Sequence, residues 1–133
     1  MKQVLLAPRT EEKLSSIALG TWTFAGDAIW GASEERECRR VVHAALDRGI
    51  TLFDSAPNYG EGRSEEILGR ALEGRPSALV ASKIKVDGKS PAQIRESVEG
   101  SLRRLQRETL DLLQLHWPGA SREETLGALD LFD

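Results

Sequence analysis

Four polar side chains of different chemistry lie at or just beyond the ends of short apolar runs in this 133-residue chain. They are Asp54, Tyr59, Lys83 and His116. An ammonium group stabilises a nearby phenolate, so Lys83 would make the Tyr59 phenol a better proton donor at neutral pH. Asp54 would hold Lys83 charged and in place, while His116 would hydrogen-bond a substrate oxygen and orient it for protonation. The four types together could protonate a substrate oxygen.

Each of these residues also has an ordinary structural use. A lysine such as Lys83 commonly ends a strand in solvent, and an aspartate such as Asp54 commonly caps a loop. Tyr59 could be a turn aromatic, and His116 could be a histidine satisfied by structural hydrogen bonds. The joint pattern, rather than any one residue, therefore points to catalysis.

The elements that must position these groups alternate regularly between strand and helix patterns. Strands are predicted at residues 17–19, 50–53, 78–81 and 110–115, and helices from about residues 33, 64, 90 and 121. Ser33 is expected to cap the first helix, whose apolar stripe comprises Cys38, Val41, Val42, Ala45 and Leu46. Capping boxes open the third helix at Ser90–Gln93 and the fourth at Ser121–Glu124. The second helix is expected to end near Gly74.

Such an alternation predicts an α/β fold with parallel strands, either a doubly wound open sheet or a closed barrel of eight units. Both architectures gather function at the carboxyl ends of the strands. The period of two places Asp54, Lys83 and His116 on one inner face, with Phe53 and Val80 toward the helices. A small hairpin is also predicted between Gln3 and Leu14, turning around Pro8-Arg9-Thr10.

Composition excludes several classes of function. The 18 basic and 21 acidic residues are interspersed and give a net charge of -3, so no nucleic-acid partner is expected. No segment is long and apolar enough for a membrane span or a secretory signal, which makes a cytoplasmic location the default expectation. The single cysteine, Cys38, is on a different helix face from His43, so no metal site is expected. The segment Gly60–Ser64 lacks the lysine of a phosphate-binding loop and is expected to permit close backbone approach.

Four motifs in order resemble the aldo-keto reductases. They are Leu19–Trp22, Phe53–Gly60 with its continuation Ser64–Gly69, Ala81–Lys83 and Asp111–Pro118. The resemblance implies a (β/α)8 TIM-type barrel that reduces aldehydes or ketones with NADPH. By this likeness Tyr59 is the general acid, Lys83 and Asp54 tune it, and His116 positions the carbonyl.

The same resemblance assigns binding residues. Gly20, Thr21, Trp22 and Asp54 occupy cofactor-binding positions, and Trp22 and Trp117 occupy positions that commonly line the substrate pocket. Without the resemblance, aromatic residues in the loops that follow the strands, such as Trp22 and Trp117, are equally suited to line a pocket or to cover the end of the hydrophobic core.

Length departs from the family. A barrel of this kind takes about 250 residues, so residues 1–133 are expected to form an N-terminal half-barrel of about four units without the C-terminal cofactor-binding half. The alternative to an active enzyme is a truncated, catalytically silent half-barrel that acts as an assembly module or is a fragment. Open strands at the sheet edges also predict self-association.

Overall fold

The computed structural model describes residues 2–5 and 13–132. The strands are β1 (Gln3–Leu5), β2 (Lys13–Ser15), β3 (Ala18–Gly20), β4 (Leu52–Asp54), β5 (Leu79–Lys85) and β6 (Leu112–Trp117). The helices are the short 3-10 helix η1 (Trp22–Ala25), α1 (Glu35–Asp47), α2 (Arg63–Ala71), α3 (Pro91–Leu105) and α4 (Arg122–Leu129). None of the helices in the described ranges is long and apolar enough to cross a membrane.

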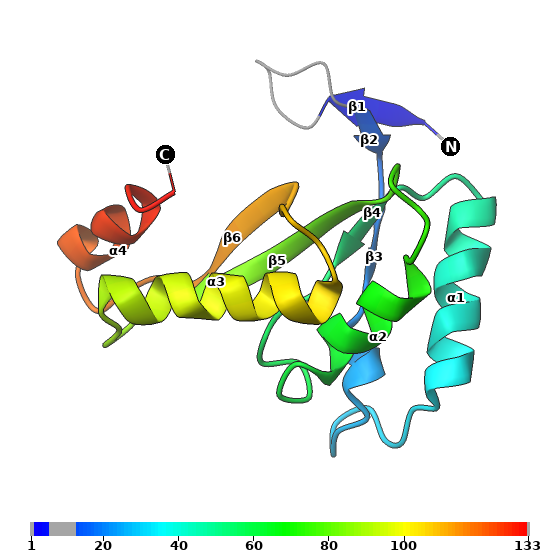
Figure 1. The fold of residues 1–133 in the computed structure, drawn as a ribbon, viewed down its shortest axis with the longest axis horizontal. Helices are drawn as coiled ribbons and strands as arrows, with labels where there is room; N and C mark the ends of the chain where they lie inside the picture. Colours follow the sequence, from blue (N-terminus) through cyan, green and yellow to red (C-terminus); the bar gives the residue numbers. More distant parts are fainter. Residues whose placement is uncertain (1, 6–12, 133) are drawn as a thin grey trace.

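Strands β3, β4, β5 and β6 form one sheet in that order, and all neighbouring pairs are parallel (Figure 1). This arrangement confirms the predicted α/β fold with four consecutive strand and helix units. Each strand begins one or two residues later than the sequence pattern indicated. The backbone register explains the shift, because pairing starts only where Ala18, Leu52 and Leu79 lie side by side.

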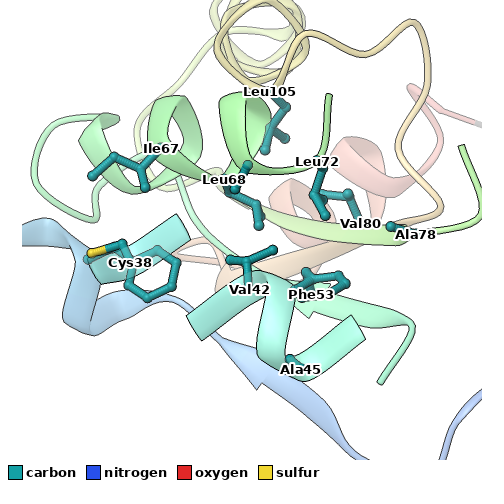
Figure 2. Packing of buried hydrophobic residues seen from close by; sticks show 12 residues of the cluster. Cys38, Val42, Ala45, Phe53, Ile67, Leu68, Leu72, Ala78, Val80 and Leu105 are labelled. Atoms are coloured by element: carbon teal, nitrogen blue, oxygen red, sulfur yellow. The ribbon is translucent and has the colours of Figure 1, made fainter. Parts of the chain in front are cut away.

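Helices α1, α2 and α3 cover one face of the sheet, and their apolar side chains meet those of the strands (Figure 1). Figure 2 shows Val42 of α1, Leu68 of α2 and Leu105 of α3 around Phe53 and Val80. Phe53 and Val80 have no exposed area, as the alternation predicted. The opposite, concave face is lined by the other set of strand residues, which are Ala18, Gly20, Leu52, Asp54, Ala81, Lys83, Leu112 and Gln114.

The predicted N-terminal hairpin is present as the antiparallel pair β1 and β2. Its expected turn at Pro8-Arg9-Thr10 lies outside the described residues. The Thr51 hydroxyl accepts a hydrogen bond from the Ser15 amide at 2.9 Å, just before β4 begins. The hairpin therefore sits at the amino ends of the parallel strands, opposite the end where polar side chains were expected to gather.

Helix α1 differs from its prediction at two residues. Ser33 does not cap it: the cap is Glu34, and the Ser33 hydroxyl instead donates to the Phe24 carbonyl at 3.0 Å. Val41 was assigned to the buried stripe but is 46% exposed, because the face that meets α2 is centred on Val42 and Cys38. Loop contacts and helix packing therefore override the local pattern.

The other helix ends follow the sequence more closely. Helix α3 has the full capping box, with Ser90 and Gln93 each bonded to the other's backbone amide. At α4 only half of the predicted box forms, because the Glu124 carboxylate accepts from the amides of Gly88 and Ala120 instead of Ser121. Helix α2 ends at Ala71, earlier than Gly74.

Candidate active site

Asp54 and Lys83 form the central ion pair of the concave face. The Lys83 ammonium donates to the Asp54 carboxylate at 2.6 Å and to the Ser55 carbonyl at 2.8 Å. Parallel pairing brings these residues together, because Asp54 lies beside Ala81 and Lys83 is the next inward-facing residue on β5. Their side chains are 30% and 13% exposed, so the lysine is held largely away from water beside a fixed anion.

Tyr59 lies in the loop that follows β4 and completes the site. Its ring centre is 5.0 Å from the Lys83 nitrogen, 5.8 Å from the stacked Trp22 ring and 5.7 Å from the His116 ring, which meets it edge-on. The tyrosine is thus surrounded by a cation, an indole and an imidazole. The structure brings together all four residues that the sequence predicted to be catalytic.

An irregularity in the sheet sets the position of His116. Strands β5 and β6 pair residue for residue up to Ile84 and Leu115, after which Lys85 pairs with Trp117 and His116 is the extra residue. An extra residue in one strand breaks the alternation of side chains and lets two successive residues reach one side. The His116 and Trp117 rings accordingly stack on each other with centres 3.9 Å apart.

The environment of His116 favours its neutral form. Burial lowers the pKa of His116 below its ordinary value, and the Lys83 charge lowers it further, while Asp54 opposes these effects. A neutral imidazole has one N–H donor, which suits a hydrogen bond to a carbonyl oxygen.

Two tryptophans border the site, at the positions that the family resemblance assigned to a substrate pocket. Trp22 is 41% exposed and stacks on Tyr59, whereas Trp117 is 47% exposed and stacks on His116. The Trp22 indole donates to Asp27 at 3.3 Å, and Trp30 packs edge-on against it at 5.5 Å. These contacts place an aromatic surface on each side of the Tyr59 and His116 pair.

Buried hydroxyl groups fix the loops that carry the site. The Ser64 hydroxyl lies 2.8 Å from the Thr21 hydroxyl and 3.1 Å from that of Ser55, and it donates to the Thr21 carbonyl at 2.8 Å. Thr21 also donates to the Asp54 carbonyl through its amide and its hydroxyl. Thr21, assigned from the resemblance to cofactor binding, therefore uses its hydroxyl inside the fold.

The glycine-rich segment before α2 permits the close approach that its sequence indicated. Gly60 and Gly62 both have positive φ, at 59° and 96°. A Cβ atom at Gly60 would lie 2.8 Å from the Ala25 carbonyl oxygen, and one at Gly62 would lie 2.5 Å from the Arg104 side chain. Side chains larger than hydrogen would push the Tyr59 loop away from η1 and α3.

Comparison with known proteins agrees with this architecture. The family model for the aldo/keto reductase family matches residues 16–132. The chain belongs to the aldo/keto reductase family. It is 44% identical over 115 residues to aldo-keto reductase YhdN of Bacillus subtilis, a match that covers 78% of this chain and 34% of the relative.

Two solved structures of this family are similar in fold. The glycerol dehydrogenase AKR11B4 from Gluconobacter oxydans matches with a TM-score of 0.71 and 47% identity, covering 84% of this chain and 38% of that one. An aldo-keto reductase from Klebsiella pneumoniae in complex with NADPH matches with a TM-score of 0.76 and 32% identity, covering 89% of this chain and 41% of that one. The chain spans between a third and a half of the length of these relatives.

The concave face carries residues that could hold one end of a nicotinamide cofactor. Gly20 leaves open space above β3, the Trp22 indole is exposed, and Asp54 and Lys83 lie beside them. Among the described residues that line this face, Lys83 is the only basic one, and it is paired with Asp54. The face therefore suits the uncharged nicotinamide ring, whereas cofactor phosphates need cations that it does not supply.

The sequence analysis missed several residues that support the site. It did not anticipate the Ser55 carbonyl as a second acceptor for Lys83, or Ser64 as the link between two loops. Lys85 was also overlooked, although its spacing of two from Lys83 along one strand could have indicated it. No cluster of potential metal ligands is present in residues 2–5 and 13–132, and His43 instead contacts the Ala71 carbonyl.

Proposed function

We propose that this chain carries the proton-donating side of an NADPH-dependent reductase of aldehydes or ketones, with Tyr59 as the general acid. The observation that supports it most directly is the position of the Lys83 ammonium, which is 2.6 Å from Asp54 and 5.0 Å from the Tyr59 ring centre. A cation held at the ring by a carboxylate can stabilise the negative charge that proton transfer would leave on the phenol oxygen.

In this mechanism the substrate carbonyl oxygen lies between Tyr59 and His116. The neutral His116 donates a hydrogen bond to that oxygen and sets its direction. Tyr59 passes its proton to the same oxygen as negative charge develops there, and Lys83 stabilises the tyrosinate that remains. NADPH, when bound beside Gly20, Trp22 and Asp54, supplies the hydride.

Turnover of an aromatic aldehyde tests the proposal. We expect the purified chain to consume NADPH with an aldehyde such as 4-nitrobenzaldehyde, and Tyr59→Phe to slow the reaction by about 10²- to 10⁴-fold, the range of general acid catalysis. Lys83→Met is expected to act in the same direction. Lys13→Met, which removes an exposed lysine on β2, is the matched control. Equal rates for the Tyr59→Phe variant and the parent chain would refute Tyr59 as the acid.

A silent half-barrel that serves as an assembly module is the second candidate. It is favoured by the concave face, where Lys83 is the one basic side chain among the described lining residues and is already paired with Asp54. A fluorescence titration with NADPH separates the two candidates. Saturable binding with turnover supports the reductase, whereas a flat titration supports the silent module.

A further inference from the structure

A small pocket next to the active site is lined by cations. Its lining includes Asn58 from the Tyr59 loop, Lys85 and Lys89 from the end of β5 and the following loop, Ser97 from α3, and His116 with Trp117 from β6. None of the described residues that line it carries a carboxylate. Its volume of about 210 Å³ is below the range of about 300–1,000 Å³ that holds whole ligands, so it suits one end of a substrate.

The sheet irregularity aims Lys85 at this pocket. Because β6 has one extra residue, Lys85 pairs with Trp117 instead of His116. The Lys85 ammonium accordingly lies 5.4 Å from the centre of the Trp117 ring, whose other neighbour is the stacked His116 ring. One indole therefore joins the lysine to the histidine that would hold the substrate carbonyl.

Both lysines keep their charge available for a ligand. Neither of them forms an ion pair within the part of the chain that the structure describes. The Glu124 carboxylate, which contacts the Lys89 loop, accepts from the amides of Gly88 and Ala120, at 2.9 and 2.7 Å. Glu124 thus joins this loop to the one after β6 without neutralising either lysine.

We propose that Lys85, assisted by Lys89, binds an anionic group at the far end of the substrate, so that the chain prefers aldehydes and ketones that carry a carboxylate or phosphate. The inference rests on the proposed function for the position of the carbonyl. To that proposed function it adds the class of substrate, a carbonyl compound with an anionic group. The carbonyl lies at Tyr59 and His116, the intervening carbon chain lies against Trp117, and the anion lies beside Lys85.

The test compares two alcohols of equal length that mimic reaction products and form no Schiff bases with lysine. 4-Hydroxybutanoate carries the anion and butane-1,4-diol replaces it with a neutral hydroxyl; binding is followed at the Trp117 indole N–H by NMR. We expect the carboxylate to bind about two- to fivefold more tightly, as suits an exposed charge pair, and added salt to reduce that preference. Glycerol 3-phosphate against glycerol tests the phosphate source in the same way.

Substitutions assign the preference to the lysine. Lys85→Gln is expected to abolish it and Lys85→Arg to retain it, whereas Lys13→Gln, which removes an equal charge from the hairpin, should leave it unchanged. Equal binding of the charged and neutral ligands, absence of binding by both, or an unaltered preference in Lys85→Gln would overturn the proposal. These titrations contain no NADPH, so they are independent of the turnover experiment. If the chain prefers the charged ligand but shows no turnover, only the reductase function is refuted. If it shows turnover but no preference for the charged ligand, only this anion-binding subsite is refuted.

Discussion

Lys83 connects more of the site than any other side chain that the structure describes. It binds the Asp54 carboxylate and the Ser55 carbonyl, both at the end of β4, and its charge faces Tyr59 and His116. The Thr21, Ser55 and Ser64 hydroxyls hold the backbone that presents these two acceptors. The position of the cation is therefore set by the fold before any ligand arrives, which is what a general acid partner requires.

Replacing Asp54 with asparagine tests the contribution of this pair to stability. We expect Asp54→Asn to lower the free energy of unfolding by about 1 to 2 kcal/mol, since the amide oxygen can still accept from Lys83 but the negative charge that balances this lysine is lost at a site only 30% exposed. Urea denaturation measures the change. Glu37→Gln breaks an exposed pair with Arg40 and should change stability by less than about 0.5 kcal/mol. An equal effect of the two variants would contradict the central role of Asp54.

The pKa of His116 gives a prediction about pH. Burial and the Lys83 charge lower this pKa below its ordinary value of 6.5, so the unfolded chain takes up the proton first as the pH falls. Well above pH 6.5 the residue is neutral in both states and has no effect on stability. As the pH falls below 6.5, His116 is expected to reduce the free energy of unfolding.

An NMR titration of the His116 ring checks this direction. We expect a midpoint below 6.5, and a higher midpoint in Lys83→Met because that variant removes the second cause of the shift. His43→Gln removes the other histidine and identifies the signal. A midpoint at or above 6.5 in the parent chain would be inconsistent with the half-buried position of His116 beside Lys83.

Helix α2 is fastened to the sheet by a buried charge. The Glu65 side chain has no exposed area, accepts from the Ser82 hydroxyl at 2.6 Å and forms an ion pair with Arg104 at 2.8 Å. It joins α2 to β5 and α3. Because Gly69 of α2 lies close to the backbone of Arg104 and Leu105, the helix cannot shift to compensate for a lost contact.

Glu65→Ala is therefore expected to destabilise the fold by about 3 to 5 kcal/mol, since it leaves Arg104 and Ser82 without their partner. Glu66→Ala removes the neighbouring, half-exposed carboxylate and should cost less than about 1 kcal/mol. Both are measured by chemical denaturation. Similar losses of stability for the two variants would mean that the buried ion pair of Glu65 contributes no more than an exposed carboxylate on the same helix.

Element patterns show what the sequence could predict and what it could not. Ser90 was correctly predicted as a cap because its partner Gln93 is three residues away and the motif is local. Ser33 does not cap its helix, because Phe24 and Arg63, which bind its hydroxyl, are brought to it only by the folded loops.

In the candidate site, the spacing of two along each strand predicted the inward positions of Asp54 and Lys83, but the extra residue at His116 arises from pairing between strands. The periodicity of a single segment does not show how that segment pairs with its neighbouring strand.

At the scale of the whole molecule, four units of a barrel leave two strands with one neighbour each. In the sheet formed by the described residues, β3 and β6 are the edges, and the concave face between them is open. Leu52 and Leu112 line that face, and the Gln114 side-chain oxygen is buried there without a hydrogen-bond partner in the described structure. Open parallel edges and an apolar face both gain free energy from pairing with another chain.

We therefore expect the 133-residue chain to associate with itself, with an average mass in sedimentation that rises with protein concentration. Leu112→Lys places a charge on the concave face and should shift the chain toward monomer, because burying an unpaired ammonium is costly. Leu126→Lys, on the exposed side of α4, is the control and should leave association unchanged. A monomer at every concentration that melts in one sharp transition would show that the open edges and the concave face are tolerated in water.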